Sequence, residues 1–145
     1  MSYTSSKIIE LGSTAFRQPF ASSHCRFIHG YHLMAKVTFA CNELDENNWV
    51  FDFGGLKKLE QIYKSQFDHA LVVASDDPGI ELFKELAAIG IVQLKIMKDG
   101  VGIEQFSKWC FDAANRFVND VTSGRVWAKN VTVYEHAKNF ASYSQ

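Results

Sequence analysis

Apolar and polar positions alternate with two different periods along this chain, and the two periods predict most of its secondary structure. In Leu33–Cys41 every second residue is apolar, whereas Lys36 and Thr38 between them are polar. A period of two buries one side of a strand and exposes the other. We expect further strands at Ile8–Phe16, Ile91–Met97 and Val126–Tyr134, and at Trp49–Phe53, which should form a hairpin with Leu33–Cys41.

The helical period appears in three other segments. Residues 54–66 carry one apolar stripe, formed by Leu56, Leu59, Ile62 and Tyr63. A second helix should open at Pro78 and end at Gly90, and a long third helix should span residues 103–122. Residues 17–26 are rich in small and polar residues and should form a loop, and Ala70–Ala74 is a short apolar segment. Strands and helices mixed in this way favour the α+β class.

Length and composition limit the classes of function. A chain of 145 residues fits one domain, residues 1–145, and an apolar content of 47% can fill a complete core. With 15 basic and 16 acidic side chains, the net charge of -1 argues against nucleic acid as the main partner. No apolar run reaches membrane-spanning length, and the first residues do not resemble a signal peptide. Three scattered cysteines form no disulfide framework, so we expect a cytoplasmic location and no membrane partner.

The stretch CRFIHGYHL is the first candidate for chemistry. Cys25 precedes His29 by four residues, and this combination serves both zinc sites and nucleophile–base pairs. The simplest alternative is an ordinary buried cysteine, which is a common place for a free thiol. Cys41 and Cys110 fit apolar stripes and should belong to the core. From these residues alone, all three interpretations of Cys25 stay open.

Four patterns follow one another along the chain. They are CRFIHGY at 25–31, WVFDFGGLKK at 49–58, FDHALVVASDDP at 67–78 and VTVYEHAKNFASY at 131–143. In this order they resemble the Cys-x-x-x-His-Gly-His, Gly-Met-Val-x-Asp-Phe-x-x-Leu-Lys, Leu-Asp-His-x-x-Leu and Val-x-Val-x-Glu-Thr segments of the 6-pyruvoyl-tetrahydropterin synthase family. That family includes the 6-carboxytetrahydropterin synthases of queuosine biosynthesis. GIEQF at 102–106 is a weaker match to the family's Thr-x-Glu-Asn-Leu. Four motifs in register indicate the fold more strongly than the reaction.

The resemblance implies the tunnelling fold, in which an antiparallel four-stranded sheet carries two main helices on one face. Subunits of the family associate through their sheet edges into trimers, trimers commonly stack into hexamers, and active sites lie between subunits. Within the second motif, we expect Asp52 to bond backbone at the start of the following helix.

The resemblance also implies chemical roles. In the family a cysteine acts as base or nucleophile, and Cys25 lies at its position. Asp68 and His69 match an aspartate–histidine pair that relays the proton, although they could instead cap local backbone. Glu135 matches the glutamate that holds the amino-pyrimidine edge of the pterin, and a lone carboxylate on an apolar strand is costly unless paired. Glu104 is either a second pterin contact or a first-turn carboxylate facing the helix dipole.

Only part of the family's zinc site is present in this sequence. Three histidines hold the metal in the family. His29 matches one, Tyr31 stands at the second, and an alignment that keeps Arg17 in place puts Phe16 at the third. A rival alignment makes His24 a ligand but removes most of the loop before the cysteine. Catalytic zinc takes three protein ligands, and a phenol with a pKa of about 10 is a poor one. Zinc is therefore doubtful, and the cofactor is left unknown.

Two functional hypotheses of different class follow. The first is a carbon–carbon or carbon–oxygen lyase of the tetrahydropterin synthase type, acting on dihydroneopterin triphosphate or a related pterin with an altered or lost zinc site. The alternative is a non-catalytic oligomer that binds a pterin or purine through the anchoring glutamate. In both, the partners are a small pterin and further copies of the chain in a trimer or hexamer. An oligomer that keeps only the fold would leave the aspartate–histidine pair unexplained.

Overall fold

The computed structural model describes the whole chain, residues 1–145. The strands are β1 (Tyr3–Phe16), β2 (His29–Cys41), β3 (Ala70–Ala74), β4 (Gln93–Met97), β5 (Val126–His136) and β6 (Asn139–Ser144). The α-helices are α1 (Lys57–Phe67), α2 (Ile80–Ala88) and α3 (Ile103–Thr122), and short 3-10 turns lie at His24–Arg26 and Phe53–Leu56. This interspersed order confirms the α+β class.

All six strands belong to one mixed sheet with the order β4-β3-β1-β2-β5-β6. β2 pairs antiparallel with β1 and β5, and β6 pairs antiparallel with β5. β3 runs parallel to both β1 and β4. A parallel pair needs a crossover connection, and α2 supplies it between β3 and β4. Every residue of β3 is buried, as expected for a strand that is covered on both faces.

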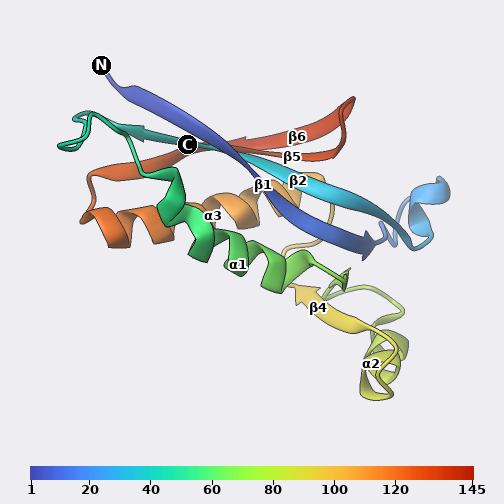
Figure 1. Cartoon of the computed structure of the whole chain (residues 1–145). Coiled ribbons are helices and arrows are strands. Elements are labelled where there is room, and N and C mark those ends of the chain that lie inside the picture. Colours follow the sequence, from blue (N-terminus) through green and yellow to red (C-terminus); the bar gives the residue numbers. More distant parts are fainter.

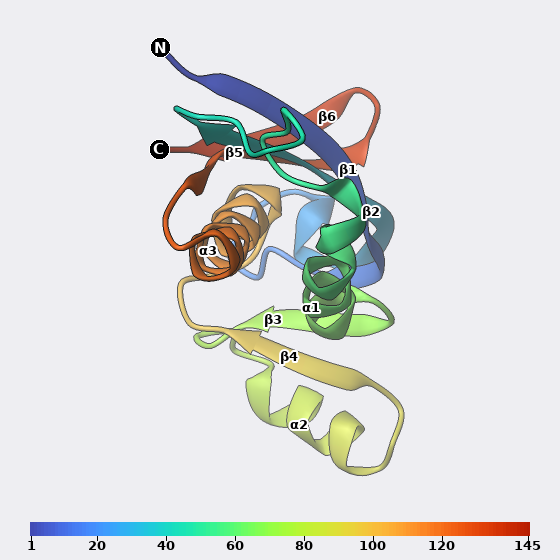
Figure 2. The same cartoon turned by 60° about the vertical axis from the view of Figure 1, so that its left-hand side comes forward.

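Helices α1 and α3 lie side by side on one face of the antiparallel strands (Figure 1, Figure 2). They cover the inward-facing residues of the sheet, such as Leu33 and Val37, which are fully buried. The opposite face carries no helix, and Glu10 and Lys36 on it are exposed. α2 packs apart from them on β3 and β4, where Phe83 belongs to a small separate cluster. The prediction of two main helices on one face is therefore correct.

Helix α3 forms the centre of the core and has the predicted bounds. Its inward stripe is fully buried and consists of Phe106, Cys110, Ala114 and Val118. The helix ends where Ser123 adopts a left-handed conformation with φ of 53°. Thr122 Oγ1 then accepts a hydrogen bond from the backbone N of Val126 at 3.1 Å, which leads the chain directly into β5.

The antiparallel four-stranded sheet is wrong in strand number. The structure adds β3 and β4 to the side of β1, and both run parallel to it. The reason is the apolar segment before α2, which is too short for a helix and finds hydrogen-bond partners along the last residues of β1. The helix predicted from Pro78 to Gly90 is α2, which forms the crossover between β3 and β4.

The predicted strand at residues 49–53 is also wrong, and no hairpin joins it to β2. The guanidinium of Arg125 donates a hydrogen bond to the backbone oxygen of Val50 at 2.9 Å. Asp45 Oδ1 accepts one from the backbone N of Trp49 at 3.0 Å. Side chains thus bind backbone groups that a strand would offer to a neighbouring strand. β2 pairs with β1 and β5 instead.

The sequence pattern also missed β6. This strand follows β5 after a two-residue turn and forms the outer edge of the sheet. Its inward residues are small or aromatic rather than uniformly apolar, which weakens the pattern. Tyr143 nevertheless packs against α3, where its ring centroid lies 5.0 Å from that of Phe111.

Besides the outer edge of β4, which pairs only with β3, two further edges of the sheet lack partners along much of their length. β3 pairs with β1 only at Thr14–Phe16, so the earlier part of β1 leaves one edge free. The outer edge of β6 is free as well, because β6 pairs only with β5. Unpaired edges of this kind are templates for association with another chain.

None of the helices is long and apolar enough to cross a bilayer.

A bulge in β1 between Glu10 and Gly12 receives the end of α1. Gly12 has a φ of 100°, and a Cβ on it would lie 2.7 Å from the Cβ of Asp68. The open space lets Asp68 Oδ1 accept a hydrogen bond from the backbone N of Ser13 at 3.0 Å. That hydrogen bond, and after it the neighbouring His69, lowers the pKa of Asp68 below its ordinary value.

Replacing Gly12 with alanine should displace Asp68 from the bulge, because the new methyl group takes up space that its side chain occupies. The Asp68 carboxyl should then titrate closer to the ordinary aspartate pKa of about 3.9, as measured by carbon-13 NMR. Gly90→Ala is the matched control, since Gly90 has a positive φ of 80° but no atom within 4 Å of the added Cβ. Equal titration of Asp68 in the two variants would contradict this account of the bulge.

Candidate active site

A cavity of about 470 Å³ opens where the ends of β1 and β2, the start of α3 and the turn between β5 and β6 meet. Four residues singled out in the sequence line it, namely Cys25, His29, Glu104 and Glu135. They come from four separate segments, so the fold brings together residues from both ends of the chain.

Cys25 lies on the short 3-10 turn in the loop after β1. Its backbone N donates to Ser23 Oγ at 3.4 Å, and its backbone oxygen accepts from the backbone N of Gln18 at 2.9 Å. Cys25 is partly exposed, whereas Cys41 and Cys110 are fully buried in the core, as predicted. The interpretation of Cys25 as an ordinary buried cysteine is therefore wrong, and its thiol borders an open cavity.

Glu135 reaches the cavity from β5, and Tyr31 lies beside it on β2. Both residues are partly buried. The pKa of Tyr31 is raised, chiefly because the phenol is removed from water and next because of the charge of Glu135. A nearby thiolate at Cys25 contributes in the same direction. The phenol therefore keeps its proton at neutral pH and can donate a hydrogen bond in this part of the site.

His29 and Glu104 complete the set on two other sides of the cavity. Nδ1 of His29 lies 2.8 Å from the backbone oxygen of Phe27, and this contact fixes the ring and leaves only Nε2 available. Glu104 lies in the first turn of α3 and is exposed. A carboxylate there interacts favourably with the helix dipole, but the side chain also borders the cavity.

Phe16, His29 and Tyr31 gather where the resemblance puts three zinc ligands. Phe16 is the cross-strand partner of His29, and their ring centroids are 5.1 Å apart. The Tyr31 ring lies 6.2 Å from that of Phe16 and 5.5 Å from that of His29. His24 is exposed and does not line the cavity. The structure thus places Phe16, and not His24, beside the other two residues.

The donors in this cluster do not fit a zinc ion. Phe16 offers no lone pair, Tyr31 keeps its proton, and the imidazole of His29 is the one remaining ligand, whereas catalytic zinc takes three. No group of three or more His, Cys, Asp and Glu side chains in the chain could hold a metal. The titratable groups that one copy places around the cavity include the thiol of Cys25, the imidazole of His29 and the carboxylates of Glu104 and Glu135.

The aspartate–histidine pair lies apart from Cys25. Asp68 Oδ1 is 3.0 Å from Nδ1 of His69, and the His69 side chain is 81% exposed. His69 has a φ of 56°, which is uncommon for a residue with a side chain, and its backbone N donates to the backbone oxygen of Ser13 at 2.7 Å. The residue borders a second hollow, of about 260 Å³, together with Gly30. Within one copy of the chain, the pair and the thiol therefore face different cavities.

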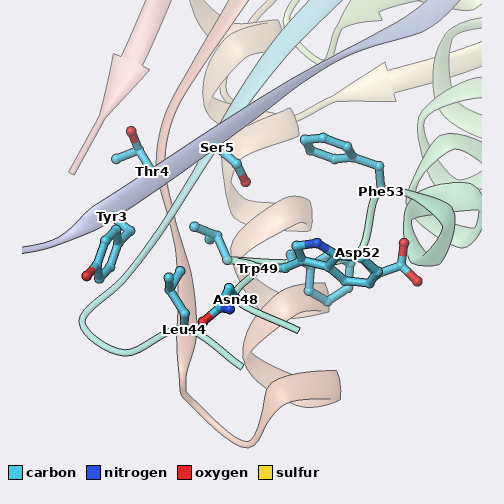
Figure 3. A pocket seen from close by; sticks show the side chains of 10 residues that line it. Tyr3, Thr4, Ser5, Leu44, Asn48, Trp49, Asp52 and Phe53 are labelled. Carbon is cyan, nitrogen blue, oxygen red and sulfur yellow. The ribbon is translucent and has the colours of Figure 1, made fainter. Parts of the chain in front are cut away.

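A further cavity, of about 460 Å³, lies at the opposite end of β1 (Figure 3). Trp49 and Phe53 line it, Asp52 is its one charged residue, and it contains no cysteine or histidine. Asp52 Oδ1 accepts a hydrogen bond from the backbone N of Gly54 at 2.9 Å, which confirms its structural role at the helix start. This cavity lacks the groups for the chemistry that the sequence motifs imply.

Sequence patterns did not single out four other residues that line the Cys25 cavity, which are Gln18, Lys138, Asn139 and Phe140. Three of them lie on the turn into β6 or at its start. The one feature of the sequence that could have pointed to these three residues was their closeness to Glu135. A strand pattern does not tell toward which face the following turn folds, so this signal alone could not place them.

Curated relatives share sequence with this chain over part or most of its length. The 6-carboxy-5,6,7,8-tetrahydropterin synthase of Rickettsia typhi is 39% identical over 57 residues, which cover 39% of this chain and 41% of that protein. The match therefore spans less than half the length of that relative. The enzyme of the same name from Aquifex aeolicus is 23% identical over 123 residues, or 83% of this chain and 76% of that protein.

Solved structures share the fold over nearly the full chain. An uncharacterized protein from Wolinella succinogenes has a TM-score of 0.84 at 15% identity, with 100% of this chain and 99% of that chain covered. A catalytic-residue mutant of Plasmodium vivax 6-pyruvoyltetrahydropterin synthase has a TM-score of 0.69 at 13% identity, with coverage of 99% and 98%. The sequence model described as 6-pyruvoyl tetrahydropterin synthase matches residues 10–145. The chain therefore belongs to the 6-pyruvoyl tetrahydropterin synthase family.

Proposed function

We propose that this protein is a lyase of the tetrahydropterin synthase type. It would cleave a carbon–carbon or carbon–oxygen bond in the side chain of dihydroneopterin triphosphate or a related reduced pterin. The observation that carries the proposal is the single cavity lined by Cys25, Glu104 and Glu135. Its volume of about 470 Å³ suits a small heterocyclic ligand.

Glu135 provides the ring-binding half of the site. Its carboxylate can accept two hydrogen bonds, from the ring N–H and the exocyclic amino group of the amino-pyrimidine edge. A bidentate pattern of this kind, with a charged acceptor, gives both affinity and orientation. Phe16 and Phe140, which also line the cavity, offer apolar surface to a flat ring.

Cys25 provides the reactive half of the site. Its thiolate is the natural group to take a proton from the side chain of the substrate, and the partly exposed position leaves it accessible. His69, held by Asp68, is suited to pass that proton onward, since the two side chains are 3.0 Å apart. The pair borders another cavity of the same copy, so the complete site needs a second copy.

The free sheet edges favour such an association. Asn139 and Phe140, at the start of β6, border the Cys25 cavity. Ser13, beside the free edge of β1, holds Asp68. If the outer edge of β6 pairs with β1 of a second copy, the Asp68–His69 pair of that copy approaches the thiol. We therefore include a homo-oligomer, a trimer or hexamer, in the proposal.

The alternative is a non-catalytic oligomer that binds a pterin or purine. The observation that favours it is the presence of Phe16 and Tyr31 at two positions where the family has zinc ligands. Such a protein would keep Glu135 as its anchor and would not turn over a reduced pterin. In the lyase, by contrast, Tyr31 serves as a neutral hydrogen-bond donor to a carbonyl or hydroxyl oxygen of the substrate.

Glu135→Ala should abolish binding of a reduced pterin and leave the fold intact. Two hydrogen bonds to a charged group contribute about 1.5–3 kcal/mol each, so affinity should fall by at least about 100-fold. Isothermal titration calorimetry with dihydroneopterin or sepiapterin measures the loss. Glu85→Ala on the exposed surface of α2 is the control and should bind normally. Unchanged affinity in Glu135→Ala would refute the anchor, and with it both proposed functions.

Protein purified without added zinc should contain well under one zinc per subunit, because His29 alone cannot retain the metal against chelators. The double variant Phe16→His, Tyr31→His should gain zinc, since both side chains lie beside His29. Elemental analysis measures both proteins. Stoichiometric zinc in the unaltered protein would contradict the altered site and would require a ligand set that this arrangement of one copy does not contain.

A mixture of Cys25→Ser and His69→Ala proteins should recover activity that neither variant has alone. If the thiol and the histidine of one site come from different copies, random mixing in a symmetric ring restores about a quarter of the sites. Turnover of dihydroneopterin triphosphate after unfolding and refolding the two variants together measures this. Wild-type protein taken through the same unfolding and refolding is the control. A monomeric mass in light scattering would rule out the shared site, and so would no recovery in the mixture when the refolded wild-type protein regains activity.

A further inference from the structure

The loop that carries Cys25 is not held by the core. None of the residues in its 3-10 turn is buried. Its large apolar side chains point outward, since Phe20 is 70% and Phe27 is 58% exposed. Most of its hydrogen bonds are internal, such as those from Arg26 to the backbone oxygens of Ser22 and Ser23. The position of the thiol must therefore depend on the few polar contacts that tie this loop to the rest of the fold.

Two side chains at the end of β1 make those contacts. Arg17 donates through one of its terminal nitrogens to the backbone oxygen of Arg26 at 3.4 Å, next to Cys25. Gln18 binds Cys25 through its backbone N, and its side-chain Nε2 donates to the backbone oxygen of Val101 at 2.9 Å. Gln18 therefore links the cysteine loop to the end of the loop before α3, and Arg17 links it to the acidic partner of the guanidinium.

Asp77 holds that guanidinium. Its side chain has no exposed surface, and its two oxygens accept from Nε of Arg17 at 2.9 Å and from a terminal nitrogen at 2.5 Å. The backbone N of Gly79 donates to the same carboxylate at 2.8 Å. The guanidinium also lies over the ring of Phe83, 5.6 Å from its centroid. A bidentate pair with a buried partner fixes an arginine far more firmly than a surface ion pair does.

We propose that Arg17, clamped by Asp77, is a positioning residue that sets the Cys25 loop against the cavity. The turn between β3 and α2 thereby controls the placement of a thiol that lies in another part of the sequence. The guanidinium binds two partners at once, because two of its nitrogens bind Asp77 and the third donates to the cysteine loop. The inference deepens the proposed function, since it concerns the residue assigned there as the reactive group.

The negative charge of Asp77 can be removed with little change in the shape of its side chain, which allows the contact between Arg17 and Asp77 to be tested. Asp77→Asn keeps the size of the side chain and an acceptor for Gly79 but removes the charge that holds Arg17. Arg17→Lys is a second and milder variant, which keeps the positive charge but cannot bind both oxygens and also reach Arg26. Asp112→Asn is the matched control, because Asp112 forms an exposed ion pair with Lys108 at 3.0 Å on the outer side of α3.

Labelling of the folded protein with iodoacetamide, followed by mass spectrometry of each cysteine, tests the proposal. Cys41 and Cys110 are fully buried, so in the native state the reagent reaches Cys25 alone. Cys25 should react at least about fivefold faster in Asp77→Asn and Arg17→Lys than in Asp112→Asn, because the loop opens locally. The amide of Gln18, which donates to Cys25, should exchange with deuterium correspondingly faster.

Two outcomes would overturn the proposal. One is a Cys25 labelling rate in both variants equal to that of Asp112→Asn. The other is faster labelling of all three cysteines together, which would mean that the ion pair only stabilises the whole fold.

Where turnover of dihydroneopterin triphosphate is measurable, Asp77→Asn should lower kcat with little change in KM, since Glu135 is untouched. Absence of turnover in the unaltered protein would refute the lyase assignment, whereas the labelling result would still decide the role of Arg17.

Discussion

The three residues at the end of β1 are the point where the two halves of this molecule are joined. Thr14–Phe16 pairs with β2 on one edge and with β3 on the other, and nowhere else does the antiparallel part of the sheet meet the parallel strands. Thr14 is buried, and its hydroxyl donates to the backbone oxygen of Phe67 at 3.1 Å, which ties the end of α1 to the same place. Elements that carry Cys25, His29 and the Asp68–His69 pair all begin within a few residues of this join. The geometry of the site is therefore set by the pairing of one short segment.

Phe16 gives this join an apolar character that matters for the chemistry. Its side chain is 2% exposed and packs edge-to-face against Phe106, with ring centroids 5.1 Å apart. Burying an aromatic side chain of this size stabilises a fold by about 1.5–3 kcal/mol. Phe16 therefore extends the hydrophobic core up to the wall of the cavity. Removal from water also raises the pKa of Tyr31, so the phenol beside Glu135 is a neutral hydrogen-bond donor.

Hydrophobic periodicity predicted the elements whose burial is decided within one segment. Helix α3 has the predicted bounds because its whole inward stripe is apolar. Periodicity failed where a distant side chain decides the backbone conformation, as at residues 49–53, where Arg125 binds the backbone oxygen of Val50. It also did not reveal that β3 is parallel to β1, because the direction of a strand follows from the path of the connecting chain, here through β2 and α1, and not from the strand's own residues.

The site could be predicted only in the part that carries recognisable motifs. Cys25 and Glu135 were named from their motifs, and the fold brings both to one cavity. No motif singled out the contact between Asp77 and Arg17, because an ion pair between residues 60 positions apart leaves no local pattern. The two interactions of Asp77 are compatible, since it receives both the backbone N of Gly79 and the guanidinium of Arg17. Contacts between residues this far apart in the sequence could not be predicted from the sequence pattern.

Stability and chemistry are divided between different parts of this chain. One continuous core of 28 buried residues joins the sheet to α1 and α3 within a single copy. The loop that carries the thiol adds none of those residues and depends instead on hydrogen bonds made by Arg17 and Gln18. His69, in a strained backbone conformation and with its ring exposed, likewise contributes nothing to the core. On the proposed arrangement, association of copies would complete the proton pathway but is not needed to form the core. The positions of Cys25 and of the His69 ring can therefore each change while the fold itself persists.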